Sequence, residues 1–455
     1  MKRGTKHIIL AFTVVLLTLI AGCKKFVEIN SPPDQIFSSD VFEDEASATS
    51  AMTGLYSEMT RTNLNFANGA LTIYAGLAAD ELYRTTASAS IDVFTVNEIP
   101  STNSILRNNL WTAPYSHIYH ANAVIEGLQR AMILDSVKQH LRGEALLTRA
   151  LCYFYLVNLY GDVPLILTTD YRTNATLPRT SVSAVYNQII IDLQNAKTAL
   201  LSSYPTSGRL RPNRWTAAAL LSRVYLYTGQ WEKAEGEASE IISSGTYSLG
   251  PITTPLSASN EVIWQLGRET QNTSEGITFI PSSATVRPVY ALTDTLVKSF
   301  ETGDLRKTNW LKSNTVSGVI YFYPFKYKAA TGTTVTERLI VFRYSEILLI
   351  RAEARTEQNN TTGALADLNV VRTRAGLSAV NTTDQGILRN AIHKERQVEL
   401  FAEWGHRWFD LKRWGKTSNL LSTLKPVTWQ LTDVLFPIPF AEIEANPFLT
   451  QNPGY

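Results

Sequence analysis

The sequence predicts a mainly α-helical fold, in which tetratricopeptide-like helix pairs form a superhelix that is interrupted by an irregular region of loops and short strands. Three observations lead to this prediction. Apolar residues recur at helical spacing along most of the chain. Residues 214–243 have the pattern of two short helices joined by a tight turn. Between residues 244 and 340 the composition changes to one rich in Thr, Ser, Gly and aromatic residues.

Four helices are expected before the first helix pair, over residues 46–59, 110–128, 139–159 and 182–201. In the second of them, Trp111, Tyr115 and Ile118 recur on one stripe, as in a helix with one buried face. The third is followed by Gly161 and Pro164, and we expect it to end there because glycine and proline terminate helices.

The clearest helix pair spans residues 214–243. Small and apolar side chains such as Ala218 and Ala234 recur along both of its helices, so the helices can approach closely, and Gly229 supplies the turn. Residues 343–376 form a weaker second pair, whose turn over residues 359–363 is expected to be longer. Repeats of this kind are stacking units, and they carry no catalytic machinery of their own.

The composition of the region between the two helix pairs predicts loops and short strands that pack against the helices. Runs at 262–266 and 319–323 are typical of strands. Long loops inside a compact protein are often where binding occurs. We therefore expect an amino-terminal helical part over residues 41–243, a ligand-facing loop region over residues 244–340, and a carboxyl-terminal helical part over residues 341–455.

The start of the chain predicts a secretion signal. Lys2, Arg3 and Lys6 precede an uncharged apolar run over residues 8–20. As a helix this run would reach roughly 20 Å, which is too short for a hydrocarbon core of about 30 Å. A basic head before a short apolar run is typical of a signal peptide, which we expect to cover residues 1–22.

Cys23 directly follows this segment. The run Ile20-Ala21-Gly22-Cys23 resembles the bacterial lipobox, in which the cysteine sulfur is acylated and the cysteine becomes the new amino terminus. More than one acyl chain makes such an anchor durable. We expect an exported protein that is held to a membrane by lipid on Cys23, with residues 23–40 as a tether. The alternative is a plain signal peptide followed by a chance cysteine.

Charge and cysteine content exclude two classes of protein. Removal of residues 1–22 takes three of the 42 basic side chains and none of the 40 acidic ones, which leaves a net charge of −1. No basic field for nucleic acid remains, so no nucleic-acid partner is expected. Only two cysteines exist, and with Cys23 acylated the other, Cys152, has no disulfide partner. It lies in an apolar helical run and is expected to be a small core residue.

Several stretches together resemble the SusD/RagB family of surface glycan-binding lipoproteins. They are CKKF (23–26), RGEALLTRALCYFYLVNLYGDVPLIL (142–167), RWTAAALLSRVYLYTGQWEKA (214–234), FETGDLRK (300–307), RYSEILLIRAEA (343–354), ERQVELFAEWGHRWFDLKRWG (395–415) and LFPIPFAEIEANPFLTQNPGY (435–455). They follow one another over nearly the whole chain after the signal segment, with the weakest coverage at 60–110 and 268–295.

The resemblance implies a helical fold built on tetratricopeptide-like pairs. It also implies a lipid-anchored position on the outer face of the outer membrane, where the protein would cap a SusC-like TonB-dependent transporter. It implies capture of a glycan for import without cleavage and without a cofactor.

Glu395, Glu399 and Glu403 recur every four residues and are expected on one helix stripe. Carboxylates on one stripe face the same way, whereas a glycosidase places two of them on either side of the scissile bond. We therefore expect an ion-pair network with nearby arginines, including Arg351 and Arg355. Catalysis and a contact with the transporter are the alternatives.

Metal and enzyme signatures are absent from the sequence. Glu403 and His406 have the Glu-x-x-His spacing of a carboxylate-bridged metal site, but such a site needs that pair twice, and no second copy exists. The chain has neither a glycine-rich phosphate loop nor a nucleophile elbow. We expect no metal and no enzymatic activity.

Aromatic residues on loops are the candidates for ligand binding. A sugar ring presents an apolar face to an aromatic side chain and hydroxyls to polar neighbours. Two regions combine such residues, 80–100 and 287–323, and from them we expect Tyr83, Tyr290, Trp310 and Tyr323 to contact the ligand. For each ring the alternative is packing beneath its loop. A peptide or another nutrient is the alternative ligand, and a surface hydrolase is the alternative that the residues favour least.

Overall fold

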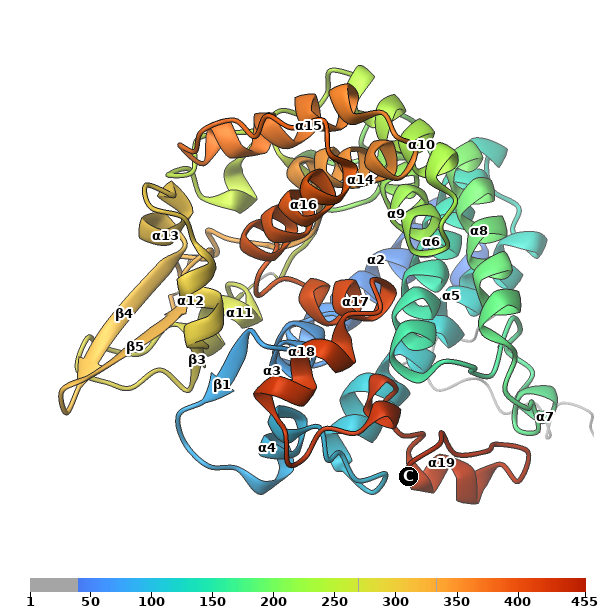
Figure 1. Cartoon of the computed structure of the whole chain (residues 1–455). Helices are drawn as coiled ribbons and strands as arrows, with labels where there is room; N and C mark the ends of the chain where they lie inside the picture. Colours follow the sequence, from blue (N-terminus) through green and yellow to red (C-terminus); the bar gives the residue numbers. More distant parts are fainter. Residues whose placement is uncertain (1–39, 269, 333) are drawn as a thin grey trace, which may run out of the picture. The chain divides into compact units, whose positions relative to one another are not determined.

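Helices make up most of the chain in the computed structural model, which describes residues 40–268, 270–332 and 334–455 (Figure 1). Residues 42–455 form one compact unit, to which the following description refers. The predicted signal segment, Cys23 and the tether up to residue 39 lie outside the described residues. Among the residues that are described, no helix is long and apolar enough to cross a membrane.

The four helices predicted in the amino-terminal part are confirmed as α2 (Glu45–Arg61), α5 (Ala113–Arg130), α6 (Asp135–Tyr160) and α8 (Val182–Ala199). The start of α5 lies later than predicted because a π-helical turn, η4 (Leu106–Thr112), precedes it. Helix α6 ends at Gly161, which has a positive φ of 73°. Cys152 lies in the buried stretch of α6 and is fully buried, as expected for a core residue.

Both helix pairs are confirmed, as α9 (Arg214–Tyr227) with α10 (Trp231–Ser243) and α14 (Tyr344–Glu357) with α15 (Thr361–Arg374). Asn213 begins the first pair: its side chain accepts a hydrogen bond from the backbone N–H of Thr216, whose hydroxyl lies against the Asn213 N–H in return. The longer second turn is a wrong prediction, since residues 228–230 and 358–360 form turns of equal length.

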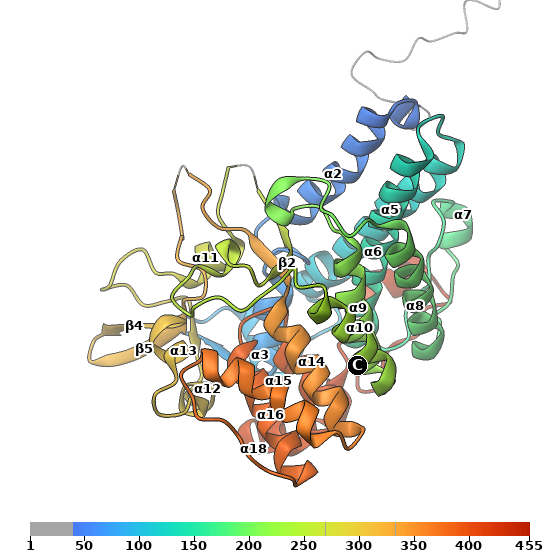
Figure 2. The same cartoon turned by 90° about the horizontal axis from the view of Figure 1, so that it is seen from above.

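The two helix pairs lie side by side although about a hundred residues separate them in the sequence. Helix α10 packs against α14, and α14 packs in turn against α16 (Gln385–Glu399), so the pairs form one continuous stack (Figures 1 and 2). Small residues such as Ala352 and Ala364 lie fully buried between these helices. The residues between the pairs therefore leave the helical stack and return to it.

Those intervening residues form three antiparallel two-stranded sheets, one of them shared with the amino-terminal part. The pairs are β1 (Leu82–Arg84) with β3 (Tyr290–Leu292), β2 (Val262–Leu266) with β6 (Leu339–Arg343), and β4 (Leu311–Val316) with β5 (Val319–Pro324). The strands predicted at 262–266 and 319–323 are confirmed as β2 and β5. Because β1 pairs with β3, residues from the first helical part and from the loop region meet at one place.

The remaining elements are short. They are η2 (Asp40–Phe42), η3 (Leu71–Ala75), α3 (Gly76–Ala78), α4 (Ala89–Val96), α7 (Tyr171–Asn174), η5 (Ser207–Arg209), η6 (Leu256–Ala258), α11 (Ser274–Phe279), α12 (Asp294–Ser299), α13 (Leu305–Asn309), α17 (His406–Arg413), α18 (Thr417–Leu424), η7 (Leu431–Val434) and α19 (Phe440–Ala445).

The carboxylates at 395, 399 and 403 form a buried ion-pair network, as predicted. Arg306 Nη1 lies 2.5 Å from Glu395 and 2.8 Å from Glu399, and Arg343 Nε lies 2.8 Å from Glu403. Helix α16 ends at Glu399, so Glu403 belongs to the turn that follows, yet its side chain reaches the same cluster.

The partners predicted for this network are wrong. Arg351 and Arg355 pair with Asp367, at 2.6 and 2.9 Å, and Arg355 also pairs with Glu235 at 2.7 Å. These contacts link neighbouring helices of the stack. The arginines that hold the carboxylates of α16 come instead from α13, from β6 and from the end of α15.

Candidate functional site

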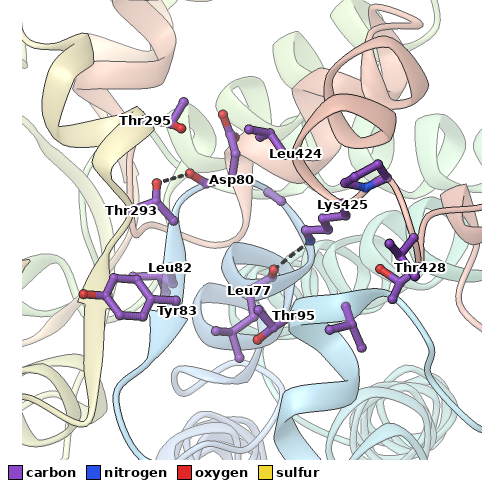
Figure 3. A pocket seen from close by; sticks show the side chains of 14 residues that line it. Leu77, Asp80, Leu82, Tyr83, Thr95, Thr293, Thr295, Leu424, Lys425 and Thr428 are labelled. Carbon is purple, nitrogen blue, oxygen red and sulfur yellow. Dashed lines mark hydrogen bonds between the residues drawn. The ribbon is translucent and has the colours of Figure 1, made fainter.

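Tyr83 borders a pocket of about 450 Å³ that we call the Tyr83 pocket. Four segments of the chain line it (Figure 3): the chain from α3 into β1, the end of α4, the residues around the start of α12, and the end of α18 with the loop that follows it. They contribute Leu77, Ala79, Asp80, Leu82, Tyr83, Thr95, Val96, Thr293, Thr295, Leu424, Lys425, Pro426, Val427 and Thr428.

Strand pairing brings the first and third of these segments together. Tyr83 lies opposite Ala291 in the β1–β3 sheet, and just beyond the sheet the backbone N–H of Thr293 donates to the carbonyl of Glu81 at 2.9 Å. The hydroxyl of Thr293 also donates to the carbonyl of Asp80 (Figure 3). Helix α4 (Ala89–Val96) is capped by Asn97, which has a left-handed φ of 63°.

Lys425 joins the fourth segment to the first two. Its Nζ donates to the carbonyls of Leu77 and Ala78, at 3.3 and 2.8 Å, and to Oδ1 of Asn97 at 2.6 Å. Burial lowers the pKa of Lys425 to about 7. These three acceptors use all three donors of the ammonium group, so Lys425 is a structural clamp rather than a free cation at the pocket wall.

The one carboxylate among the described lining residues is also bound by protein. Arg407 Nε and Nη2 donate to the two oxygens of Asp80, at 2.7 and 2.9 Å. Such a fork-shaped contact is among the strongest that a carboxylate makes. What the pocket offers to a ligand is therefore an apolar surface, one aromatic ring and hydroxyl groups.

The apolar surface includes side chains that water reaches. Val427 is 93% exposed and Leu424 is 43% exposed, and both lie in or beside the loop that follows α18. Among the hydroxyl groups, Oγ1 of Thr95 is buried and has no hydrogen-bond partner in the described chain. A buried hydroxyl without a partner costs free energy.

The Tyr83 ring is half-buried, and its hydroxyl points away from Leu77 and Lys425 (Figure 3). Burial raises the pKa of Tyr83, and the neighbouring Tyr321 and Asp294 raise it further. Tyr321, on β5, is also half-buried and carries the guanidinium of Arg287 at 5.2 Å from its ring centre. Tyr321 is therefore near enough to influence Tyr83, although it does not line the pocket.

The other three predicted ligand residues do not line this pocket. Tyr290, Trp310 and Tyr323 are only 2%, 1% and 2% exposed. Nη1 of Arg84 lies 3.4 Å from the Tyr290 hydroxyl, and the Tyr323 ring packs edge-on against Phe325. Their positions do not support ligand contact, and a binding role for them stays a prediction.

Trp310 lies inside the ion-pair network. Lys326 Nζ and the guanidinium carbons of Arg343 and Arg374 lie 4.8, 5.6 and 5.3 Å from its ring centre. The negative face of the indole attracts these cations. Trp310 thus stabilises the cluster that joins the loop region to α16.

Residues 424–428 line the pocket but were not among the predicted ligand residues. The sequence does carry a signal there, because Leu424, Pro426 and Val427 surround a single lysine. In the structure Leu424 ends α18, and all three apolar residues are exposed. Proline ends the helix and leaves its apolar neighbours on a loop.

In every comparison with known proteins, this chain is similar to SusD-like proteins. A family model described as the SusD family matches residues 300–455, and one described as starch-binding associating with outer membrane matches residues 25–226. A SusD-like protein of Formosa agariphila is 24% identical over 97% of this chain and 98% of its own length. A second from the same organism is 27% identical over 98% of this chain and 99% of its own length.

Solved structures share the fold. A SusD superfamily protein from Bacteroides vulgatus superposes with a TM-score of 0.81 at 20% sequence identity, over 91% of this chain and 100% of that one. A laminarin binding SusD-like protein superposes with a TM-score of 0.76 at 24% identity, again over 91% of this chain and 100% of that one.

Proposed function

Because the chain belongs to the SusD family, we propose that it binds a glycan at the cell surface and delivers it to a SusC-like TonB-dependent transporter in the outer membrane. The Tyr83 pocket is the proposed binding site. The laminarin binding relative supports a carbohydrate ligand.

One observation carries this proposal: Tyr83 stands beside an apolar pocket whose polar groups are mostly threonine hydroxyls. The face of a sugar ring consists of C–H groups, which pack on an aromatic ring, and its rim consists of hydroxyls, which need neutral hydrogen-bonding partners. The second ring, Tyr321, would extend this surface for a longer chain of sugars.

Binding without cleavage agrees with the chemistry of the lining. A glycosidase needs two carboxyl groups flanking the scissile bond, roughly 5–10 Å apart depending on the mechanism. The described residues that line the pocket include one carboxylate, Asp80, which Arg407 holds in a two-pronged contact. We propose that the protein captures its ligand and carries out no hydrolysis.

Anchoring through lipid on Cys23 belongs to the same proposal, because the matched family model describes association with the outer membrane. Cys23→Ser removes the acyl acceptor. The protein should then leave the membrane fraction and appear in the soluble one. Unchanged membrane attachment of this variant would contradict the lipid anchor.

The binding site is tested by substitution of Tyr83. Tyr83→Ala should weaken binding of the best ligand from a glycan panel by about tenfold, because ring contacts contribute ~1 kcal/mol beyond their buried area. Tyr83→Phe keeps the ring and should bind nearly as well as the original protein. Titration calorimetry measures both variants.

Tyr171→Ala is the matched control, since Tyr171 is 72% exposed and does not line the pocket. Its affinity should be unchanged. If no glycan binds, or if Tyr83→Ala binds as tightly as Tyr171→Ala, the proposed site is wrong.

A peptide or another nutrient remains the alternative ligand, since the apolar lining also suits such molecules. Titration with a protein digest in place of the glycan panel separates the two. Incubation of the protein with polysaccharides should release no reducing ends, and their release would contradict the absence of hydrolysis.

A further inference from the structure

A second pocket of about 450 Å³ lies where α16, α17 and α18 meet, and we call it the α16–α18 pocket. It shares no lining residue with the Tyr83 pocket. The two are nevertheless linked, because Arg407 lines the second pocket and holds Asp80, which lines the first.

The charged side chains that line the α16–α18 pocket are all basic. Lys394, Arg407 and Lys416 line it, and no acidic side chain is among the described residues that do. Arg407 is neutralised by Asp80 at 2.7 Å. The lysine charges have no such partner, since neither ammonium group lies within 4.0 Å of a carboxylate in the described part of the chain.

The contacts of the two lysines are few. Lys394 makes no side-chain hydrogen bond to any described residue, while Lys416 Nζ contacts Nδ1 of His393 at 2.9 Å and Oδ1 of Asn390 at 3.5 Å. Burial lowers the pKa of His393 to about 3, so this ring is neutral and accepts from Lys416. Two ammonium groups thus retain unused donors at one pocket.

Both lysines are half-buried and lie near the charge of Arg407. Burial lowers the pKa of Lys394, while Glu301 raises it and Arg407 lowers it. Burial also lowers the pKa of Lys416, and Arg407 lowers it further. The nearest acids to Lys394 are Glu301 and Glu395, which are bound by other arginines, Glu301 by Arg372 at 2.7 Å. An anion in the pocket would stabilise both ammonium groups.

Neutral groups complete the lining. The amides of Asn390, Gln397 and Asn419 offer both donors and acceptors, which suits hydroxyls. Trp414 forms part of the wall, with His393 stacked on it at 3.6 Å. The volume falls within the range of roughly 300–1,000 Å³ that is usual for small-molecule sites.

We propose that the α16–α18 pocket binds an acidic sugar, whose carboxylate or sulfate group contacts Lys394 and Lys416 while its hydroxyls meet the three amides. The assignment of an anion stands on the contacts above. The assignment of a sugar rests on the proposed function. The pocket would then hold an acidic unit of the same glycan, or a separate acidic sugar.

The test compares matched ligands by calorimetry: a uronic-acid trisaccharide, a sulfated trisaccharide, the neutral trisaccharide and inorganic sulfate. The original protein should bind both acidic trisaccharides more tightly than the neutral one. Lys394→Gln and Lys416→Gln should each weaken acidic binding by about tenfold, because each variant loses one charge-assisted hydrogen bond to the anion. Lys298→Gln, at an exposed lysine of α12, should leave it unchanged.

Two results would overturn the anion site: no binding of either acidic trisaccharide, or a Lys394→Gln/Lys416→Gln double variant that binds them within twofold of the original protein. Thermal melting shows whether that variant is folded. Binding of inorganic sulfate as tight as that of the sulfated trisaccharide would overturn the sugar assignment. The two proposed sites are tested separately. In the Tyr83→Ala background, Lys394→Gln and Lys416→Gln should still weaken binding of the acidic trisaccharides, whether or not the Tyr83 pocket binds glycan.

Discussion

Glu81 is a fully buried carboxyl group beside the Tyr83 pocket. One of its oxygens lies 3.4 Å from the backbone nitrogen of Ala402, and the other has no hydrogen-bond partner in the described chain. Burial, and after it the charge of Asp80, raises the pKa of Glu81 from 4.5 to about 8. In the folded protein the group therefore keeps its proton at neutral pH.

This shift predicts how stability depends on pH. Between pH 4.5 and about 8 the unfolded chain releases the Glu81 proton while the folded protein retains it, so the free energy of unfolding falls as pH rises. One group contributes at most about 1.4 kcal/mol per pH unit. Glu81→Gln should flatten this decline and raise stability at pH 8.

Urea denaturation at pH 5 and pH 8 measures the effect of Glu81→Gln. Glu444→Gln, at an exposed position on α19, is the control and should behave as the original protein does. For each protein the measured quantity is the fall in unfolding free energy from pH 5 to pH 8. If this fall is as large in Glu81→Gln as in the original protein, Glu81 is not protonated in the folded state.

Trp310 shows how one buried ring supports several charges. Its removal would leave a cavity among Lys326, Arg343 and Arg374, and would take away the ring that attracts them. Trp310→Ala should lower the free energy of unfolding by roughly 3–5 kcal/mol, as is usual for a buried tryptophan. Trp310→Phe keeps an aromatic face and should lose less.

Glycan affinity distinguishes this structural role from a binding role. In the folded fraction of Trp310→Ala at low temperature, the affinity should equal that of the original protein. A fully stable Trp310→Ala protein that no longer binds glycan would show that Trp310 reaches the ligand.

At the scale of elements, the corner between α16 and α17 depends on Gly405. Its φ of 69° is left-handed, and a Cβ atom there would lie 2.6 Å from Cβ of Ala75. Gly405→Ala should therefore lower the free energy of unfolding by about 2–4 kcal/mol, through backbone strain of ~1–2 kcal/mol and overpacking of similar size.

Gly415 provides a matched control. It follows α17, its φ is 64°, and no atom lies within 4 Å of a Cβ placed there. Gly415→Ala should lower the free energy of unfolding only by the strain of about 1–2 kcal/mol. Denaturant titrations measure the unfolding free energy of both variants. If Gly405→Ala loses no more than Gly415→Ala, the close contact between residue 405 and Ala75 of η3 does not contribute to stability.

At the scale of the whole molecule, a buried ion pair joins the two helical parts. Arg223 on α9 donates to both oxygens of Glu346 on α14, at 2.7 and 2.8 Å, and to the Tyr155 hydroxyl at 3.0 Å. Glu346→Gln leaves a buried arginine without a counter-charge and should cost about 3–5 kcal/mol of unfolding free energy.

Chemical denaturation of two further variants checks this reasoning. Arg223→Met combined with Glu346→Gln should recover part of the loss, because no uncompensated charge then remains buried. Asp294→Asn breaks an exposed pair with Lys298 and should cost roughly 0–1 kcal/mol. A Glu346→Gln loss no larger than that of Asp294→Asn would contradict a structural role for the buried pair.

Local patterns in the sequence were enough to predict the long amino-terminal helices, the two helix pairs and the family. Helical periodicity involves residues three or four positions apart, so Asn213, Gly229 and their neighbours carry the information for a helix pair within a short stretch. The same holds for β2 and β5, which are short apolar runs. The family follows from motifs that are each local and that occur in one order along the chain.

Most residues of the candidate sites could not be predicted from local patterns, although Tyr83 was. The Tyr83 pocket combines four segments, and the α16–α18 pocket depends on how three helices meet. Tyr83 and Trp310 look alike in the sequence, as aromatic residues among polar neighbours, yet one lines a pocket and the other lies beneath charged side chains. The physical reason is that the burial of a loop side chain depends on segments far away in the chain, whereas helix formation depends on its immediate neighbours.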